Sequence, residues 1–539
     1  MKDYKRLKDP IYGYINIPRQ YMNGIIDTAC FQRLRRIIQT SYSPLYSSAV
    51  HNRFVHSMGV FHLGEIAANQ INFEISNKYQ FDFDVQRITD IFLLACLLHD
   101  VGHAPFSHTG EEFYLDNEKK FDDIHAKLIE VVSGKNFAKD VPQGNTNAAA
   151  PHEIMSAIVG IISFPCFFNN ESEREFFARC ITGYKYSEKN VESDIRNCFI
   201  QLLNSKVIDV DKLDYLIRDA YITGFDTVSI DYERLLGALT IVKTDRGYEL
   251  AYYKNAISVI ENVVYAHDAE RKWIQSHPTV IYETYILQHI IAHLSTQVAL
   301  LGKKLFCLES LLSEGQEFKE NVKISLMSDD DIVYLMKNIF PNELSAEYFK
   351  RIDRRHPVWK SEAEYKAFFL GKTSGGDILH EFEQAMAATA KYLARRSDVW
   401  TINHHLIDII SKELEDIDKQ DLDEMTKAIQ KSDKQKILKV ITCLQKFATE
   451  KQMNCDFIII KATQFNSGFS KPDFSDTNIS FPLGNGNEKV AKVGQIVSSL
   501  SAKSKDRDEF FYLFYKRDDS CSVELTSQEL CSTLIREFV

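Results

Sequence analysis

The chain has 539 residues, of which 45% are hydrophobic and 26% are charged, values that are typical of a globular protein and exclude wholesale disorder. Its net charge of −11 argues against a protein that coats nucleic acid, because phosphate binding requires a basic face. The ten cysteines are scattered without a CxxC pair, and we find neither an apolar signal segment nor a run that could span a bilayer. We therefore expect a cytoplasmic protein with reduced thiols, no membrane segment and no indication of nucleic acid binding.

Hydrophobic periodicity predicts a helical first half. Alternating apolar positions around Pro10 and Gly13 predict a hairpin, and residues 25–40 predict a helix capped by Asp27 or Thr28. Further helices are expected over 58–79, 85–99, 152–163, 172–183, 192–224 and 255–301, the last of them bent at Pro278. The Gly-, Pro- and Asn-rich stretch 133–151 is expected to be an irregular loop.

The pattern changes after about residue 305. Residues 308–450 are helical in pattern and highly charged, which we interpret as solvated helix surface. From residue 454 the stretches "CDFIIIKA", "NISFPL" and "FFYLFYK" predict strands, and "TSQELCSTLIREF" predicts a closing helix. We predict a mainly α protein with a helical core in 1–305, a helical extension in 306–450 and a small α+β C-terminal lobe in 451–539.

Metal-ligand chemistry is concentrated in "LLHDVGHAPFSHTGE", where an apolar helix delivers His99 and Asp100 side by side. Two further ligands stand in similar settings, His56 in "HNRFVHSMGV" and Asp211 in "VIDVDKLDYLIRD". A single buried histidine is more often a satisfied core residue, so it is the joint arrangement that indicates a metal site. Mixed imidazole and carboxylate ligands suit Mn, Fe, Zn, Ni or Mg.

The motifs "RFVHS", "LLHDVGHAPFSHTGE", "PHEIMS" and "DVDKLDYLIRD", in this order, resemble the HD-domain deoxynucleoside triphosphate triphosphohydrolases. The likeness is greatest to the branch whose vertebrate members carry a sterile-alpha-motif domain, which we do not expect here. The resemblance covers the first 300 residues and implies that the helical core is an HD domain. It also implies metal-dependent hydrolysis of dNTPs to deoxynucleoside and triphosphate.

Carried over by position, the resemblance assigns roles to individual residues. It implies the metal ligands His56, His99, Asp100 and Asp211, and the catalytic residues His152, Glu111 and His103. It implies the substrate contacts Arg53, His108, Lys212, Tyr215, Asp219 and Gln39. Physically, the basic residues could neutralise phosphoryl charge, while a histidine oriented by a carboxylate could supply a proton near neutral pH.

Three positions depart from the family pattern on the sugar and phosphate side. Ala266 and Ile274 stand where the resemblance implies an arginine on the phosphates and a tyrosine against the sugar. Thr40 replaces a leucine beside Gln39 and adds a hydroxyl near the sugar. The sequence therefore leaves the base preference and the discrimination between deoxyribose and ribose open.

The same resemblance implies regulation by a guanine nucleotide, with a site formed by Lys5, Asp27, Gln32 and Arg35. Packing of this helix beneath the active site is an equally simple explanation for its residues. A second effector site is not expected, because its basic positions read Thr240, Tyr253 and Val259. Effectors of this family bind at subunit junctions, so we predict a homo-oligomer, with a tetramer favoured.

Two other functions remain open. One is an HD phosphohydrolase acting on a nucleoside monophosphate, a cyclic or oligonucleotide signal, or a guanosine alarmone. The other is a nucleotide-sensing regulator that keeps the metal and has little turnover. His152 and Glu111 favour an enzyme, because a binding protein has no use for a general acid. Both a role in nucleotide housekeeping and a role in antiviral defence are compatible with the sequence.

Overall fold

The computed structural model describes the chain except for residues 1–3, 116–117, 135, 143, 226–228, 321, 352–353, 370–375, 395–397, 418, 420–422, 463–467, 471, 484–487, 497–510, 517–522 and 539. Contacts divide the chain into two compact units, each of which is discontinuous in sequence. The first unit comprises Met1–Arg271, Gln297–Leu335 and Asn466–Ser504, and the second comprises Lys272–Thr296, Met336–Phe465 and Lys505–Val539. The predicted domains, by contrast, are consecutive segments.

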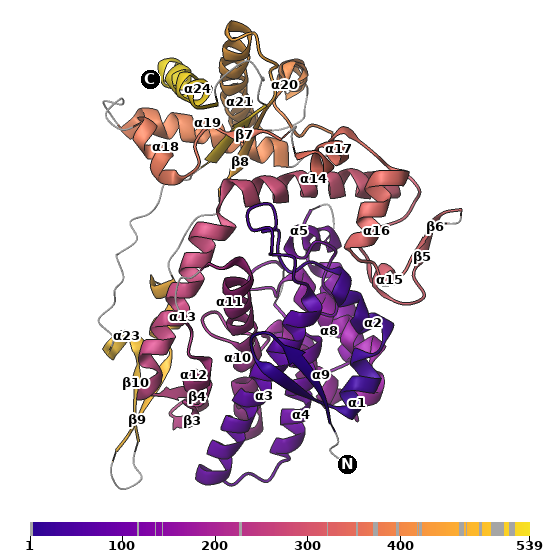
Figure 1. Ribbon diagram of the computed structural model, residues 1–539, viewed down its shortest axis with the longest axis vertical. Helices are drawn as coiled ribbons and strands as arrows, with labels where there is room; N and C mark the ends of the chain where they lie inside the picture. Colours follow the sequence, from indigo (N-terminus) through magenta and orange to yellow (C-terminus); the bar gives the residue numbers. More distant parts are fainter. Residues whose placement is uncertain are drawn as a thin grey trace. The chain divides into compact units, whose positions relative to one another are not determined.

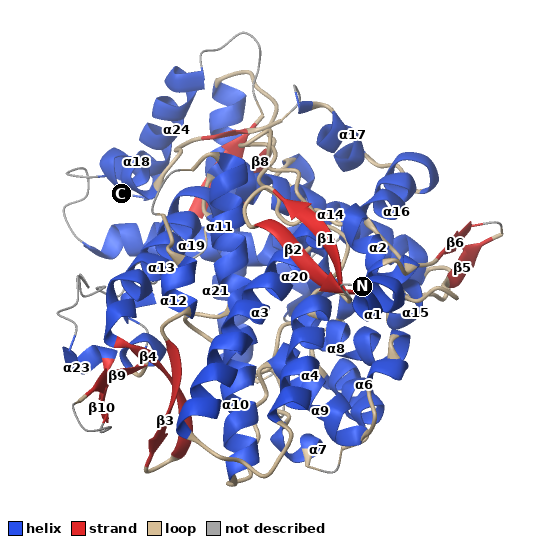
Figure 2. Ribbon diagram, turned by 60° about the horizontal axis from the view of Figure 1, so that its bottom comes forward, coloured by secondary structure: helices blue, strands red, loops and turns tan. Residues whose placement is uncertain are grey.

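Helices predominate in the first unit (Figures 1 and 2). Its longer helices are α3 (Arg53–Lys78), α4 (Val85–Leu98), α6 (Asp122–Val132), α8 (Pro151–Ser163), α9 (Glu171–Thr182), α10 (Val191–Leu203), α11 (Val210–Thr223) and α13 (Ile257–Glu270). Its shorter helices are α1 (Arg19–Tyr21), α2 (Ala29–Gln32), α5 (His108–Glu111), α7 (Phe137–Asp140), α12 (Tyr232–Leu236), α15 (Leu308–Leu311), α16 (Asp329–Tyr334), α22 (Pro472–Ser475) and α23 (Val493–Ile496). The helix α3 packs against both α4 and α11, and α8 packs against α6 and α9.

Small sheets accompany these helices. The predicted N-terminal hairpin is present as β1 (Tyr4–Asp9) and β2 (Gly13–Pro18), which are antiparallel. A four-stranded sheet has the order β10-β9-β4-β3, in which β4 and β9 are parallel and the other pairs are antiparallel. Its strands are β3 (Leu239–Thr244), β4 (Gly247–Tyr253), β9 (Asn478–Pro482) and β10 (Glu488–Lys492). The strands β5 (Gln316–Lys319) and β6 (Val322–Ile324) form a second hairpin.

The second unit is also mainly helical. Its helices are α14 (Pro278–Ala299), which continues into the first unit, α17 (Glu343–Phe349), α18 (Glu362–Phe369), α19 (Gly376–Ala394), α20 (His404–Ile417), α21 (Glu424–Glu450) and α24 (Val523–Phe538). A three-stranded sheet of order β7-β11-β8 is formed by β7 (His356–Pro357), β8 (Phe457–Lys461) and β11 (Phe511–Tyr515). The strand-rich segment after residue 454 therefore contributes strands to both units.

Side-chain caps fix where the helices of the functional region begin. The carboxamide of Asn52 accepts a hydrogen bond from the backbone N–H of Val55 at the start of α3. The carboxylate of Asp209 accepts one from Lys212 at the start of α11, at 2.7 Å. Such caps satisfy N–H groups that have no intrahelical partner, and each stabilises a helix by about 1 kcal/mol. Two caps thus set the register of the helices that carry His56 and Asp211.

Two glycines allow the close approach of these helices. A Cβ at Gly59 of α3 would collide with the carboxylate of Asp214 on α11. A Cβ at Gly102 would collide with the backbone of Met155 and Ser156 in α8. Only glycine permits such contact between backbone and neighbour. As a result, the segment that follows α4 lies directly against α8, and α3 lies directly against α11.

Several expectations are confirmed and others are wrong. The helices at 58–79, 85–99, 152–163 and 172–183, the three C-terminal strands and the closing helix are all present. The continuous helix over 25–40 is not. Instead, a π-helical turn (Met22–Ile26) precedes α2, which Thr28 caps, and a 3-10 turn (Arg33–Arg36) follows it. Ile38 then pairs with Asn52 in a β-bridge, which is incompatible with helix.

The predicted helices over 192–224 and 255–301 are each interrupted. The first breaks between α10 and α11, where Asp209 caps a new helix, and the second breaks before Pro278 after a π-helical turn. The β3–β4 hairpin was not expected, and the short helix α7 interrupts the predicted loop 133–151. The prediction of a mainly α fold with small sheets is confirmed. None of the helices in the described part of the chain is long and apolar enough to span a membrane.

Candidate active site

Two histidines and two aspartates converge at the junction of α3, α11 and the end of α4. His56 Nε2 lies 3.2 Å from His99 Nε2 and 2.9 Å from Asp211 Oδ1. His56 Nε2 also lies 3.7 Å from Asp100 Oδ2, and His99 Nε2 lies 3.5 Å from Asp100 Oδ1 and 3.6 Å from Asp211 Oδ1. Metal–ligand bonds of about 2.1 Å place ligand atoms about 3.0–3.4 Å apart. The separations of His56, His99 and Asp211 therefore fit one metal ion, and Asp100 lies beside them with one carboxylate oxygen near each histidine.

The other ring nitrogens of the two histidines are already engaged. His56 Nδ1 lies 2.7 Å from Asp214 Oδ2, and His99 Nδ1 lies 2.9 Å from the carbonyl of Cys96. Each Nδ1 therefore donates, which leaves each Nε2 available to a metal ion. In the absence of a metal, His56 Nε2 carries a proton and donates to Asp211 Oδ1 at 2.9 Å. A metal ion at this position would replace that proton.

The carboxylates of this centre stay ionised although they are buried. Burial lowers the pKa of His56, but its hydrogen bonds to Asp211 and Asp214 raise it to about 10. Burial raises the pKa of Asp100, but Arg53, His99 and His56 hold it below its usual range. The pKa of Asp211 is likewise held low, against burial, by both histidines. Carboxylates that stay ionised while buried favour a cation in their midst.

Arg53 joins the metal centre to the segment that follows it. Its Nη1 donates to Asp100 Oδ2 at 2.9 Å and its Nε donates to Ser107 Oγ at 2.8 Å. Its Nη2 donates to the carbonyl of Gln39 at 3.3 Å. The side chain is only 4% exposed, so Arg53 is not an ordinary solvated surface arginine. A guanidinium held beside a metal ligand is well placed to meet a phosphate on that metal.

A second cluster contains His103, His108, Glu111 and His152. Their candidate ligand atoms all lie within 4.8 Å of one another. Glu111 accepts hydrogen bonds from His108 Nδ1, at 3.0 Å, and from His152 Nδ1 at shorter distance. The rings of His103 and His152 stack with centroids 4.3 Å apart. The sequence predicts all four as active-site residues, and the structure brings them together.

The charges around this second cluster favour an anion over a second metal ion. Burial lowers the pKa of His103 well below its ordinary value, and Arg53, His152, His108 and Arg33 lower it further. Both ring nitrogens of His103 are buried without a hydrogen-bond partner among the described residues. Burial also lowers the pKa of His152, but Glu111 raises it to about 9. A neutral His103 beside several cationic side chains is a surface for phosphate oxygens.

The residues predicted to meet the sugar lie along one stripe of α11 and the segment before α3. Asp211, Tyr215 and Asp219 are spaced four residues apart and so share a helix face. Asp219 Oδ1 lies 2.7 Å from His51 Nε2, and the backbone N–H of Gln39 donates to the carbonyl of His51 at 2.9 Å. Along an α-helix, eight residues cover about 12 Å. This face of α11 therefore extends from the metal-ligand candidate Asp211 to the polar side chain of Asp219.

Lys212 is not directed as predicted. Its Nζ donates to Asp209 Oδ2 and to the carbonyl of Ser205, both at 2.7 Å. These bonds hold the ammonium beside the cap of α11. Contact with a phosphate would require Lys212 to leave both partners.

The four predicted effector residues fall into a bonded pair, Gln32 and Arg35, and two separate side chains, Lys5 and Asp27. Arg35 Nε donates to Gln32 Oε1 at 2.9 Å, and its guanidinium lies 3.5 Å from the centroid of the Phe54 ring. Lys5 on β1 and Asp27 after the π-helical turn are exposed. Within the first unit these side chains therefore form no closed site around a guanine.

Sequence reasoning missed several side chains that support the site. Asp214 accepts from Arg218 Nε and Nη2, at 2.9 and 3.0 Å, and Arg218 Nη1 also reaches Asp9 Oδ2 at 3.1 Å. The i, i+4 spacing of Asp214 and Arg218 is visible in the sequence. The second carboxylate bound by Arg218, that of Asp9, is over 200 residues away in the chain. His51 and Ser107 stand within the quoted motifs, but nothing in those motifs indicates their partners Asp219 and Arg53. Contacts between distant segments thus complete the site.

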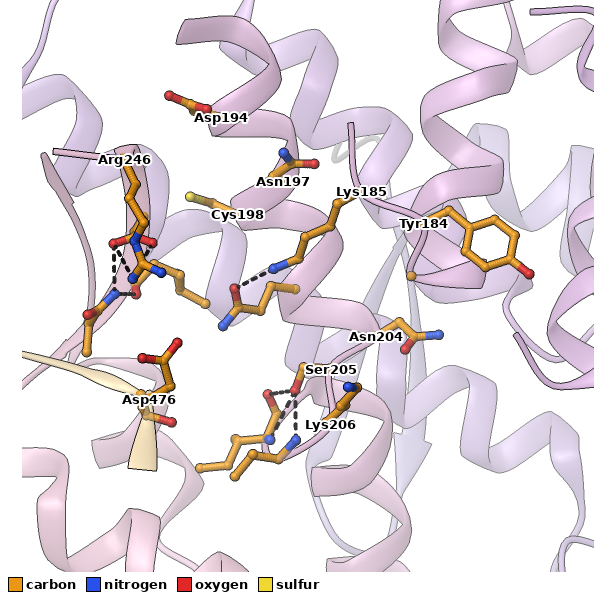
Figure 3. A pocket seen from close by; sticks show the side chains of 18 of the residues that line it. Tyr184, Lys185, Asp194, Asn197, Cys198, Asn204, Ser205, Lys206, Arg246 and Asp476 are labelled. Carbon is orange, nitrogen blue, oxygen red and sulfur yellow. Dashed lines mark hydrogen bonds and ion pairs between the residues drawn. The ribbon is translucent and has the colours of Figure 1, made fainter. Parts of the chain in front are cut away.

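A separate cavity shares no residue with either cluster (Figure 3). It has a volume of about 700 Å³ and is lined by side chains of α9, α10, β4 and the segment before α11. Several of its polar and charged groups contact one another. Arg246 lies 3.0 Å from Glu249, Lys492 lies 3.2 Å from Asp476, and Lys185 donates to Gln201 at 3.2 Å. We therefore place the chemistry at the histidine clusters and not in this cavity.

Comparisons with known proteins agree with this geometry. Residues 53–154 match the family model described as "HD domain", which spans His56, His99, Asp100 and His152. The "Uncharacterized protein YwfO" of Bacillus subtilis is 28% identical over 293 residues, which are 54% of this chain and 56% of that protein. A hypothetical protein from Aquifex aeolicus of known crystal structure has a TM-score of 0.51 at 17% identity, covering 98% of this chain and 100% of its own. That structural likeness concerns the fold alone.

Some of the relatives carry a functional name. The "Deoxynucleoside triphosphate triphosphohydrolase SAMHD1 homolog" of Dictyostelium discoideum is 29% identical over 245 residues, 44% of this chain and 39% of that protein. The Xenopus laevis "Deoxynucleoside triphosphate triphosphohydrolase SAMHD1" is 30% identical over 244 residues, 43% and 36% of the two chains. The matched region spans about half the length of the first curated relatives. The chain is therefore a mainly helical protein with an HD domain. Over less than half of its length it is similar to proteins named SAMHD1 deoxynucleoside triphosphate triphosphohydrolases.

Proposed function

We propose that the protein is a metal-dependent phosphohydrolase that converts dNTPs to deoxynucleoside and triphosphate. The observation that carries the proposal is the pairing of two sites in one place. One is a set of two histidines and two aspartates with ligand spacing, and the other is a histidine–carboxylate pair in a cationic cluster. Arg53 bonds to the metal-ligand candidate Asp100 and is close enough to His103 to lower its pKa. Phosphoryl transfer requires groups that neutralise the phosphoryl charge close to a group that handles the proton. The metal-ligand set and the histidine–carboxylate pair would supply these two functions.

The metal would be held by His56, His99, Asp100 and Asp211. This mixed nitrogen and oxygen set suits Mn, Fe, Zn, Ni or Mg. A divalent cation there would neutralise phosphoryl charge and lower the pKa of a water molecule. Asp214 and the Cys96 carbonyl would orient the two imidazoles.

The chain's own residues would bind the polyphosphate and move the proton. Arg53 and His108 would bind phosphate oxygens, since Arg53 is fixed by its bonds to Asp100 and Ser107 and His108 is exposed. His152 is the proposed general acid. Its Nδ1 is bonded to Glu111, so its Nε2 is left for the leaving oxygen of the substrate. The raised pKa of His152 keeps that proton in place at neutral pH.

A second candidate is hydrolysis of another nucleotide at the same site. Ala266, which replaces the implied phosphate-binding arginine, is an apolar side chain with 6% exposure and cannot contact a phosphate through charge. The hydroxyl of Thr40 is buried and lacks a hydrogen-bond partner among the described residues. A ribonucleotide with a 2′-hydroxyl could supply that partner. These two positions favour an altered substrate over a binding protein without turnover.

The deciding experiment screens purified protein with Mn²⁺ against all dNTPs and NTPs, with the products separated by chromatography. Release of intact triphosphate from dNTPs supports the proposal. Release of monophosphate or pyrophosphate, or turnover of ribonucleotides alone, supports the second candidate. A protein that binds metal and nucleotide but releases no product refutes the enzymatic proposal.

The remaining parts of the proposal concern regulation, assembly and place. We propose a guanine-nucleotide effector bound through Lys5, Asp27, Gln32 and Arg35, in a homo-oligomer whose favoured form is a tetramer. The exposure of Lys5 and Asp27 is compatible with a site that a second subunit completes. We also propose that the protein acts in the cytoplasm, where nucleotide pools lie.

A further inference from the structure

A carboxylate outside the HD domain match binds the segment that carries the second cluster. Asp329, the first residue of α16, accepts a hydrogen bond from the backbone N–H of Phe106 to Oδ1 at 2.6 Å. Its Oδ2 accepts another from the backbone N–H of Ile38 at 2.8 Å. These partners are 223 and 291 residues away in the sequence. One side chain thus connects α16 to two separate segments of the candidate active site.

The segment that Asp329 holds has a strained backbone. Phe106 and Ser107 have φ angles of 57° and 54°, a region that residues with a side chain rarely adopt. Two such residues in succession persist only where the surroundings determine their conformation. The N–H that Asp329 accepts belongs to the first of these two residues. Loss of that bond would release the segment toward an unstrained conformation.

This segment positions phosphate-binding groups. Ser107 Oγ donates to the carbonyl of Ile38 at 2.5 Å and accepts from Arg53 Nε at 2.8 Å. His108 follows directly and begins α5. The two N–H groups bound by Asp329 therefore flank the Ser107–Ile38 contact, so the carboxylate reinforces the same junction that fixes Arg53.

The residues next to Asp329 are anchored in turn. Arg33, which is buried, donates from Nε to the carbonyl of Met327 at 2.6 Å, and from its other nitrogens to the carbonyls of Val101 and His103. The N–H of Met327 donates to the carbonyl of Ser310 at 2.8 Å. The segment before α16 is thereby tied to the same catalytic segment at a second point. The contacts of Met327 therefore hold the segment that carries Asp329 in place.

We propose that Asp329 is a positioning residue of the phosphohydrolase, which holds the 106–108 segment so that Arg53 and His108 meet the substrate phosphates. The proposal rests on the proposed function, because the phosphate contacts of these two residues are part of it. It assigns a catalytic contribution to a segment far outside residues 53–154. Asp329 does not touch the substrate or the metal.

The test compares Asp329→Asn and Asp329→Ala with the wild type and with Asp330→Asn. The asparagine retains one acceptor oxygen and presents an NH₂ group to the other N–H, so one of the two bonds is lost, whereas alanine loses both. Asp330 is the matched control, because it is the neighbouring carboxylate but is 69% exposed and lies 3.6 Å from Arg36. Melting temperature, metal content, kcat, KM and inorganic tripolyphosphate affinity are measured for each protein.

We expect KM to rise and tripolyphosphate affinity to fall about 10-fold in Asp329→Asn and further in Asp329→Ala, with metal content unchanged. Asp330→Asn should match the wild type. A merely structural role would lower the active fraction, and hence kcat and the melting temperature, while KM stayed constant, and that pattern overturns the proposal. If the wild type hydrolyses no nucleotide, the proposed function fails separately. Tripolyphosphate affinity then decides, and equal affinity in all four proteins refutes positioning by Asp329.

Discussion

Replacement of Asp214 tests whether the metal centre depends on the carboxylate behind its first histidine. Asp214 is buried, and its Oδ2 lies 2.7 Å from His56 Nδ1. Asp214→Asn keeps the shape of the side chain but removes its charge. The amide keeps one acceptor oxygen, but its NH₂ group cannot accept from His56 or from Arg218. The variant should therefore weaken the orientation and the basicity of His56 without creating a cavity.

The expected magnitude follows from the bonds that are lost. Removing a partner of a ligating histidine costs about 10–100-fold in metal affinity, or about 1.4–2.7 kcal/mol. The two bonds from Arg218, at 2.9 and 3.0 Å, also lose their charge assistance, and Arg218 keeps only Asp9 as an ionic partner among the contacts described above. Since metal binds the folded state, stabilisation by excess metal should fall by the same about 1.4–2.7 kcal/mol.

The assay is a competition titration with Mn²⁺ or Zn²⁺ against a chromophoric chelator, together with thermal unfolding with and without metal. Asp194→Asn serves as the control, because Asp194 on α10 accepts from the N–H of Tyr248 and does not face either histidine. It should bind metal like the wild type. An Asp214→Asn protein whose metal affinity lies within twofold of the wild type would refute the reasoning.

Four further outcomes are expected. Replacing His99 and Asp100 together should abolish bound metal and hydrolysis, and stoichiometric metal found by elemental analysis would contradict the ligand assignment. His152→Ala should keep metal and substrate affinity while kcat, measured at saturating substrate, falls by about 100-fold, and unchanged kcat would make His152 structural. Activity should decline above about pH 9, because the pKa of His152 is raised to about 9 by Glu111 against burial and its proton is lost there; in Glu111→Gln the decline should begin at lower pH in the pH–rate profile. Arg35→Ala should lose any response of activity and light-scattering mass to GTP, and a monomer indifferent to GTP in both proteins would show that α2 serves packing alone.

The sequence predicts the core of the site well because its signals are local. His99 and Asp100 are adjacent at the end of an apolar helix, and the structure brings His56 and Asp211 to the same point. The ends of α4 agree with the periodicity, whereas α3 begins at Arg53, five residues before the predicted start, because Asn52 caps it. The structure therefore brings together residues that local patterns in the sequence single out.

The rest could not be predicted because it depends on distant contacts. Residues 25–40 have helical periodicity, yet Ile38 pairs with Asn52 and Arg33 turns inward to bind three carbonyls, so tertiary contacts override local propensity. A lysine is an ordinary phosphate ligand, but the ammonium group of Lys212 donates to Asp209 instead. Asp329 carries no motif at all. Each of these outcomes depends on a partner that a single sequence does not reveal.

The ion pair between Arg218 and Asp9 has a dynamic consequence. Asp9 is the last residue of β1, and its carboxylate also accepts from the N–H groups of Ile11 and Tyr12 in the hairpin turn. A continuous row of charges thus runs from His56 through Asp214 and Arg218 to that turn. Local opening of the hairpin must break this row, so hydrogen exchange of the turn amides should slow when metal binds. The N-terminal hairpin would then report metal occupancy in a protein that is making no turnover.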